Sequence, residues 1–251
     1  MATGVITEKP VLRIRQFSTR NKKGKARFSG VFFQLGKRVF DIVVSTLIIT
    51  FVLSWLIPIL AVLIRLDSKG PVFFVQTRIG FLGIPFRCYK LRTMYVNVDS
   101  DTKQAVHNDS RITRLGHFLR ITSLDELPQF LNVLIGDMSV VGPRPFMKKD
   151  DQKFSIVVSN YPLRYCAKPG ITGMAQVKGY RGRTDTLLSI FHRYQWDAFY
   201  VRNARPFLDF KILRITGRQM IKTFYSLRSI KMDEMERLNV SEAKFLLENL
   251  R

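Results

Sequence analysis

The sequence contains little cysteine and little histidine. Two cysteines, Cys88 and Cys166, and three histidines occur in 251 residues, and they form no cluster in the sequence. A disulfide framework and a zinc site both need more closely spaced Cys or His residues, so neither is expected. The expected setting is therefore a reducing, cytoplasm-facing one.

Acidic residues are scarce as well. Asp and Glu number 19 against 41 Lys and Arg, which gives a formal net charge of +22 at pH 7. A charge of this sign and size predicts an anionic partner: a nucleic acid, an anionic lipid surface or a phosphorylated substrate. Because 46% of the residues are hydrophobic, the charge does not indicate a disordered chain.

The N-terminus is the most basic part of the chain. Residues 1–38 contain ten Lys and Arg and a single acidic residue. We predict a basic N-terminal arm over residues 1–35, which by itself suits a nucleic acid as well as a membrane surface. The segment that follows decides between the two.

The sequence has only one long apolar run. Residues 42–64 are 23 residues without a charge. As a helix they would measure about 34 Å, enough to cross a hydrocarbon core of about 30 Å. We therefore predict a membrane helix over residues 36–66. A buried helix of a soluble protein is the alternative, but few such helices are apolar on every side.

Two features favour a helix that enters the membrane and returns over a helix that crosses it. Pro58 removes a helical hydrogen bond and bends the helix axis. Basic residues flank the run on both sides, at Lys37, Arg38, Arg65 and Lys69, so the positive-inside rule gives no orientation for a crossing helix. A re-entrant helix hairpin satisfies both observations, and a kinked span stays open as an alternative.

The rest of the chain predicts an α+β fold. We expect a small mixed α/β domain over residues 67–225, with amphipathic surface helices, and a helical tail over residues 226–251. Strands are predicted at 71–75 and 86–94, and helices at 111–121, 128–135, 181–193 and 207–224. These elements are short and do not alternate regularly, which argues against an orderly βαβ array.

The most informative segment is SLDELPQ, residues 123–129. Pro128 fits the first position of a helix, which places Asp125 and Glu126 just before a helix N-terminus. The plain structural interpretation is a capping box formed by Ser123 and Glu126. The chemical interpretation is that one carboxylate attacks phosphorus while its neighbour holds Mg²⁺.

Several basic residues are candidates for phosphate binding. Arg144 lies between two prolines, which give its guanidinium a rigid mount. Lys90 and Arg92 share one face of a predicted strand and could neutralise a diphosphate. Arg111 forms a neighbouring pair with Asp109, which a turn or cap would also explain; solvated side chains would explain the others. Together with the apolar run, these residues suggest phosphoryl or glycosyl-phosphoryl transfer at a membrane surface.

An ordered set of motifs resembles the bacterial sugar transferase family, the monotopic phosphoglycosyl transferases that act on polyprenyl phosphate. The motifs are KRxFDI (37–42), GPVFFxQxRxG (70–80), KLRTM (90–94), DxR (109–111), SLDELPQ (123–129), NVLxGDMSVVGPRP (132–145) and PGITG (169–173). They extend over roughly residues 37–220, and an ordered set is far more specific than any single motif.

This resemblance implies a catalytic domain with a defined mechanism. Asp125 would attack the sugar-bearing phosphorus of a UDP-sugar, expel UMP and form an aspartyl phosphosugar, from which polyprenyl (undecaprenyl) phosphate takes the sugar phosphate. Glu126 would be a ligand of Mg²⁺. The residues assigned to phosphate and nucleotide binding are Lys90, Arg92, Arg111 and Arg144.

The resemblance also implies a location and a sugar. A re-entrant helix kinked at Pro58 would hold the catalytic domain on the cytoplasmic face of the bacterial inner membrane. Many small family members have Ser directly before this proline, whereas here Ile57 precedes it and Ser54 lies one turn earlier. The stretch YRGRTDT (180–186) is similar to exopolysaccharide-type members that transfer glucose 1-phosphate, which favours UDP-glucose over UDP-galactose.

Two non-enzymatic hypotheses stay open. A basic nucleic-acid-binding protein explains the charge but not the apolar run, and no nucleic-acid motif is recognisable, so we do not expect a nucleic acid as partner. A membrane-surface scaffold with an inactive site predicts that Asp125→Asn leaves function intact. The sequence does not determine the polyprenyl length, the polymer being made or whether the chain forms homo-oligomers.

Overall fold

The computed structural model describes residues 29–100, 103–106, 109–182 and 186–226. Most of the predicted basic arm and nearly all of the predicted C-terminal tail lie outside these residues. The described part is a mixed helix and sheet structure with one long apolar helix near the N-terminus, in agreement with the predicted α+β class.

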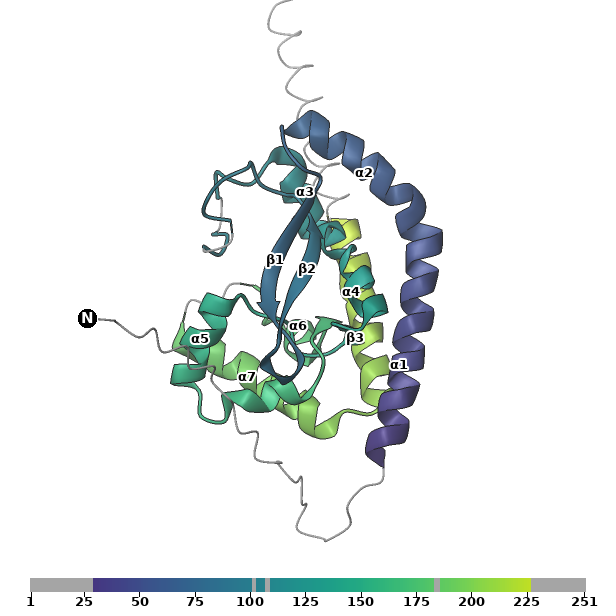
Figure 1. The fold of residues 1–251 in the computed structure, drawn as a ribbon, viewed down its shortest axis with the longest axis vertical. Coiled ribbons are helices and arrows are strands. Elements are labelled where there is room, and N and C mark those ends of the chain that lie inside the picture. The colour runs from purple at the N-terminus through teal and green to yellow at the C-terminus, as the bar shows by residue number, and fades with distance from the viewer. Residues whose placement is uncertain (1–28, 101–102, 107–108, 183–185, 227–251) are drawn as a thin grey trace, which may run out of the picture.

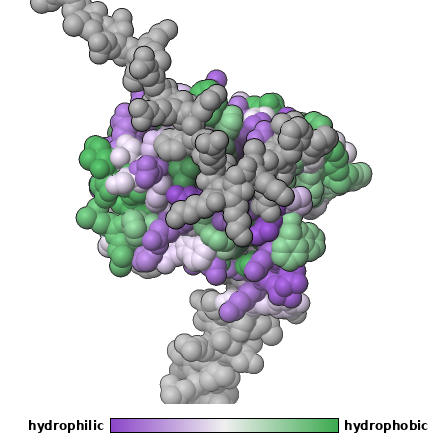
Figure 2. All heavy atoms as spheres, turned by 90° about the horizontal axis from the view of Figure 1, so that it is seen from below, coloured by the Kyte–Doolittle hydropathy of each residue, from purple (hydrophilic) through white to green (hydrophobic). Residues whose placement is uncertain are grey.

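The long helix extends along one whole side of the molecule (Figure 1). It consists of α1 (Ser29–Ile48), a π-helical turn (Ile49–Leu53) and α2 (Ser54–Asp67). Among the described residues, its 35-residue part from Phe33 to Asp67 is the one helix long and apolar enough to cross a membrane. Figure 2, seen from below, shows hydrophobic surface on both the left-hand and the right-hand side, and α1 lies on the right-hand side in Figure 1.

The helix curves where the sequence predicts a bend. Pro58 lies inside α2, and the π-helical turn precedes it, so that the Ser54 amide donates to the Ile49 carbonyl. The Ser54 hydroxyl donates to the Thr50 carbonyl one turn earlier. Backbone acceptors left by the irregular turn therefore receive side-chain donors. The structure contains one bent helix, and the return of this helix as a membrane hairpin stays a prediction.

Two small sheets form the centre of the domain. β1 (Phe73–Ile79) and β2 (Pro85–Leu91) are antiparallel, with Phe73 opposite Leu91. β3 (Ser139–Val141) and β4 (Gly170–Thr172) are parallel. At the end of β3, a Cβ on Gly142 would lie 2.2 Å from the Lys168 carbonyl oxygen, so only glycine fits this close approach.

Helices surround these sheets. They are α3 (Arg114–Thr122), α4 (Gln129–Ile135), α5 (Lys148–Val157), α6 (Met174–Val177), α7 (Leu187–Asn203) and a helix over residues 206–226. The predicted helix at 181–193 is wrong in its bounds, because α7 continues to Asn203 through a segment predicted as a connection. One face of this part of α7 is buried, which outweighs the mixed polarity of its sequence.

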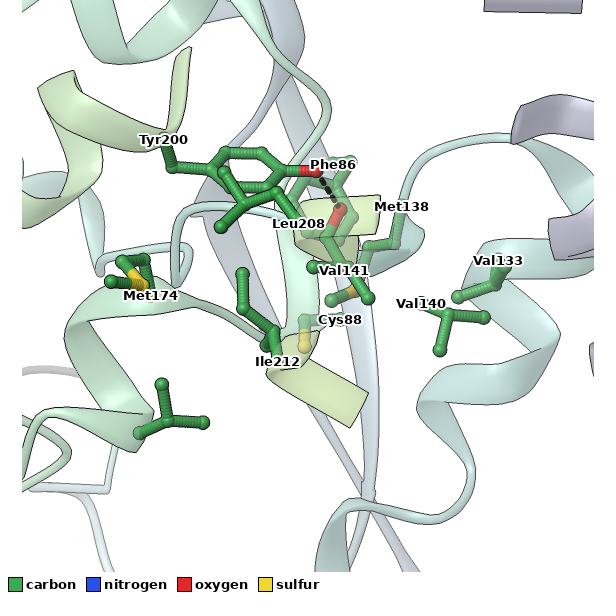
Figure 3. Packing of buried hydrophobic residues seen from close by; sticks show 11 residues of the cluster. Phe86, Cys88, Val133, Met138, Val140, Val141, Met174, Tyr200, Leu208 and Ile212 are labelled. Atoms are coloured by element: carbon green, nitrogen blue, oxygen red, sulfur yellow. Dashed lines mark hydrogen bonds between the residues drawn. The ribbon is translucent and has the colours of Figure 1, made fainter. Parts of the chain in front are cut away.

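The main hydrophobic core lies between the sheets and the C-terminal helices. Figure 3 shows Cys88 of β2, Val141 of β3, Tyr200 of α7 and Ile212 of the last helix packed together. The Tyr200 hydroxyl donates to the Val141 carbonyl, which satisfies a polar group inside this core. A second cluster joins α2 to β2 and α3 through residues that include Ile64, Leu91 and Leu119.

Candidate active site

The SLDELPQ segment forms a tight connection between α3 and α4. α3 ends at Ser123, whose φ of 63° is left-handed, and a 3₁₀ turn of Leu124–Glu126 follows. Pro128 then precedes α4, as predicted. The predicted capping box is wrong: the Ser123 side chain forms no capping bond, and the Glu126 carboxylate turns away toward basic residues.

Three cations hold the Glu126 carboxylate. Its oxygens accept from Lys90 Nζ at 2.7 Å, from both terminal nitrogens of Arg144 at 2.6 and 3.1 Å, and from Arg181 at 3.2 Å. Only 5% of Glu126 is exposed. Burial alone would raise the pKa of this carboxyl, but Arg144, Lys90 and Arg181 outweigh burial and hold the pKa well below its usual range. Glu126 is therefore a fixed negative charge.

Asp125 stands beside it without such partners. The residue is 8% exposed, and within the described part of the chain its carboxylate has no hydrogen bond or ion pair. Burial raises the pKa of Asp125, while the nearby Lys90 charge opposes this shift. The two adjacent carboxylates therefore differ in their surroundings. The charge of Glu126 is balanced by direct contacts with cations, whereas the Asp125 oxygens are free of such contacts and available to react.

Both carboxylates line a cleft of about 540 Å³, a volume typical of small-molecule sites. The basic residues along its wall outnumber the acidic ones and come from distant parts of the chain: Arg78, Lys90, Arg92, Lys103, Arg120, Arg144, Arg181 and Arg193. An excess of positive charge in a partly enclosed site favours a multiply charged anion such as a diphosphate.

Comparison with known proteins agrees with this geometry. The sequence pattern of the bacterial sugar transferases matches residues 32–223, which include the long helix and the cleft. The chain belongs to the bacterial sugar transferase family.

Three relatives of this sugar transferase are named UDP-glucose:undecaprenyl-phosphate glucose-1-phosphate transferase. The protein from Klebsiella pneumoniae is 47% identical over 72% of this chain, and that from Escherichia coli K12 is 46% identical over 73%. The Caulobacter vibrioides protein is 44% identical over 77%. The chain spans 39% of the length of each of the first two relatives and 72% of the third.

The structure of the transferase brings four of the predicted site residues together. Lys90, Asp125, Glu126 and Arg144 meet in the cleft, although 54 positions separate the first from the last along the chain. β2 supplies Lys90, the 3₁₀ turn supplies the two carboxylates, and the segment after β3 supplies Arg144.

The other two predicted cations contact protein groups rather than the two carboxylates; of these two, Arg92 lines the cleft and Arg111 does not. Arg92 lies just beyond β2, and its guanidinium donates to carbonyls at the end of α2, at 2.6 Å to Lys69 and 2.7 Å to Ser68. Arg111 forms an ion pair with Asp109 at 2.6 Å, and this contact holds the pKa of Asp109 well below its usual range. Their assignment to phosphate binding stays a prediction.

Five basic residues that line the cleft were not assigned to the site from the sequence: Arg78, Lys103, Arg120, Arg181 and Arg193. Arg120 lies near the end of α3, where its Nε donates to the Thr93 hydroxyl at 2.7 Å. Arg181 belongs to the YRGRTDT stretch, from which only a preference for UDP-glucose was predicted. Arg193 of α7 donates to the Gly182 carbonyl and lies on the helix whose bounds were wrong. Of the five, only Arg78 and Arg181 belong to a stretch that the sequence analysis singled out, Arg78 as part of GPVFFxQxRxG.

The two carboxylates also bear on the predicted metal. Asp125 and Glu126 offer oxygen ligands, the chemistry that Mg²⁺ prefers, and Mg²⁺ commonly uses one or two carboxylates together with substrate phosphates. Within the described residues there is no group of three or more His, Cys, Asp or Glu residues suited to a metal ion. These carboxylate oxygens therefore fit a metal ion that binds together with a phosphorylated substrate. For this, one of the basic side chains that contact Glu126 must shift its contact to the substrate phosphate.

Proposed function

We propose that this sugar transferase moves glucose 1-phosphate from UDP-glucose to undecaprenyl phosphate and releases UMP. The observation that carries the proposal is the free Asp125 carboxylate beside the cation-bound Glu126 in a basic cleft. The family and the shared name of three relatives support the substrates. The reaction would be the first membrane step in building an exopolysaccharide or another glycoconjugate.

In the first step, an Asp125 oxygen attacks the sugar-bearing phosphorus of UDP-glucose. A bond from oxygen to phosphorus forms, the bond from phosphorus to the UMP oxygen breaks, and the electron pair leaves with UMP. Among the residues that the structure describes, none donates a hydrogen bond to the Asp125 carboxylate, which leaves its lone pairs available for this attack. In the second step, an oxygen of undecaprenyl phosphate attacks the same phosphorus and restores the carboxylate.

The cations of the cleft stabilise charge during both steps. Arg144, Arg181 and Lys90 already contact a carboxylate, so each is positioned to donate to phosphate oxygens at the same place. Glu126 would hold Mg²⁺ beside the attacking Asp125. When bound, Mg²⁺ offsets phosphate charge and makes the phosphorus more electrophilic.

We also propose that the long helix enters the cytoplasmic side of the inner membrane and returns. Its early part is tied to the domain by Lys37, which pairs with Asp209 at 2.6 Å, and by Asp41, which accepts from the Val140 amide at 2.9 Å. Its end is tied to the same domain through Arg92. A helix whose two ends bind one globular domain supports re-entry over crossing.

The test is UMP release by the purified full chain with undecaprenyl phosphate and a panel of UDP-sugars. We expect release with UDP-glucose, a covalent hexose phosphate on Asp125 by mass spectrometry, and loss of both in Asp125→Asn by at least about a thousandfold. Asp137→Asn is the control, because it neutralises a carboxylate outside the cleft. Wild-type release by Asp125→Asn contradicts the proposal.

A further inference from the structure

A second set of buried charges lies behind the cleft. Arg164 comes from the 3₁₀ segment Tyr161–Cys166, and its side chain is 3% exposed. It lies outside the residues that line the cleft, so it does not reach a substrate bound there. Two buried carboxylates face it: Asp151 of α5 and Asp197 of α7.

The Arg164 guanidinium joins three elements to the segment that carries Arg144. One terminal nitrogen donates to Asp197 at 3.1 Å and to the backbone carbonyl of Arg144 at 2.5 Å. The other donates to Asp151 at 3.4 Å and to the Tyr161 hydroxyl at 3.2 Å. A planar guanidinium serves these partners at once, which a single ammonium cannot do.

The same guanidinium lies on an aromatic ring next to Arg144. Its central carbon is 4.3 Å from the centre of the Phe146 ring, two residues beyond Arg144. Both the carbonyl and the downstream side chain of the Arg144 segment are therefore held by one residue.

The neighbouring carbonyls of this segment are held as well. Pro143 accepts from the Gly170 amide at 2.9 Å, Pro145 accepts from Arg78 at 2.7 Å, and Phe146 accepts from the Ile79 amide at 3.0 Å. At Arg144 the corresponding donor is the buried side chain of Arg164. The backbone that carries the Arg144 guanidinium is thus held in part by Arg164, which lies outside the residues that line the cleft.

We propose that Arg164 is a positioning residue for the transfer reaction, acting through Arg144, with Asp197 as the counter-charge that fixes it. This rests on the proposed function of the cleft. Misplacement of a catalytic group by about 1 Å can cost about a hundredfold in rate, so loss of the Arg164 contacts should lower kcat without removing any group from the cleft.

A double-mutant cycle tests this inference in the full chain. Arg164→Lys keeps the positive charge between the two carboxylates but loses the two terminal guanidinium nitrogens that donate to several partners at once. We expect kcat for UMP release to fall about 10- to 100-fold. Arg144→Lys should lower kcat by at least as much. If Arg164 acts through Arg144, the double variant is no slower than Arg144→Lys alone.

Losses that multiply in the double variant, or a wild-type rate in Arg164→Lys, overturn the inference. Asp197→Asn is a milder variant with nearly unchanged shape, for which we expect a smaller loss and the same failure to add to Arg144→Lys. Asp209→Asn is the matched control, since it breaks a buried ion pair away from the cleft and should combine independently with Arg144→Lys. Absence of UMP release by the wild type instead refutes the proposed function.

Discussion

At the scale of single residues, the site depends on the contrast between two adjacent carboxylates. Glu126 is held by three cations and stays ionised, whereas the buried Asp125 carboxylate has no hydrogen bond or ion pair within the described ranges. A nucleophilic carboxylate needs free lone pairs. A carboxylate that holds cations in place needs lone pairs that accept hydrogen bonds from them. One peptide bond therefore separates two residues that burial and contacts have made chemically different.

This contrast predicts the acidic side of the pH profile. As the proposed nucleophile, Asp125 would react only when deprotonated, and burial raises its pKa. As the pH is lowered, UMP release should therefore begin to decline at a higher pH than it would with an ordinary aspartate. Lys90 lowers the pKa of Asp125, so Lys90→Gln should move the acidic limb further up in pH. The measurement is kcat/KM against pH for both proteins. A limb that moves down in Lys90→Gln contradicts the assignment of that limb to Asp125.

The sequence predicted the central residues of the cleft better than their surroundings. Asp125, Glu126, Lys90 and Arg144 belong to motifs, and the structure brings them together. Arg193 could not be found, because a lone Arg on a misplaced helix carries no local signal. The capping box failed for an electrostatic reason: a buried glutamate gains more from three cations than from one backbone amide.

At the scale of elements, the bent helix and the strand β2 depend on each other. Arg92, just beyond β2, donates to carbonyls at the C-terminal end of α2, where no helical donors remain. The sequence predicted that Arg92 and Lys90 share a strand face. It could not predict that the strand ends at Leu91, between them, because end positions are set by tertiary contacts.

Arg92→Lys should therefore affect stability more than substrate binding. An ammonium cannot serve both Lys69 and Ser68 carbonyls in the same geometry, and we expect a loss of about 2–3 kcal/mol in the free energy of unfolding. KM for UDP-glucose should change by less than about threefold. Thermal unfolding in detergent and steady-state kinetics measure the two effects. A large rise in KM with unchanged stability supports the phosphate-binding assignment instead.

The topology of the helix can be tested with single cysteines. In a Cys166→Ser background, which removes the exposed cysteine, Gln34→Cys and Lys69→Cys should both react with a membrane-impermeant reagent added from the cytoplasmic side. Both positions flank the apolar segment, whose ends bind the same domain. Ile59→Cys in the middle of the helix is the protected control. Reaction of the two flanking cysteines from opposite sides demonstrates a crossing helix.

At the scale of the whole molecule, the cleft gathers cations and the long helix exposes large apolar side chains. Phe51 of the π-helical turn and Trp55 of α2 are among them, at 68% and 56% exposure. Exposed apolar surface of this extent marks a membrane or protein contact. The +22 charge predicted anionic partners but could not by itself divide them between lipid headgroups and substrate phosphates.

Membrane association should depend on this helix rather than on hydrophobic surface in general. The double variant Phe51→Asp and Trp55→Asp places two charges where we expect hydrocarbon, at a cost of about 2.5–3.5 kcal/mol each. We expect most of this variant to stay in the supernatant when mixed with vesicles. Ile156→Asp is the control, because Ile156 is 86% exposed on α5, on the opposite side of the molecule from α1. Equal release of both variants argues against a specific embedded helix.

The attachment of the long helix at both ends has a consequence for the lipids that the protein tolerates. A crossing helix must match the thickness of the whole bilayer, and a mismatch makes it tilt or deforms the lipids. A helix that enters and leaves through one leaflet meets no such requirement. The rate of UMP release should therefore change little between vesicles of short-chain and long-chain lipids with the same headgroups, and this catalyst could work in membranes of quite different thickness.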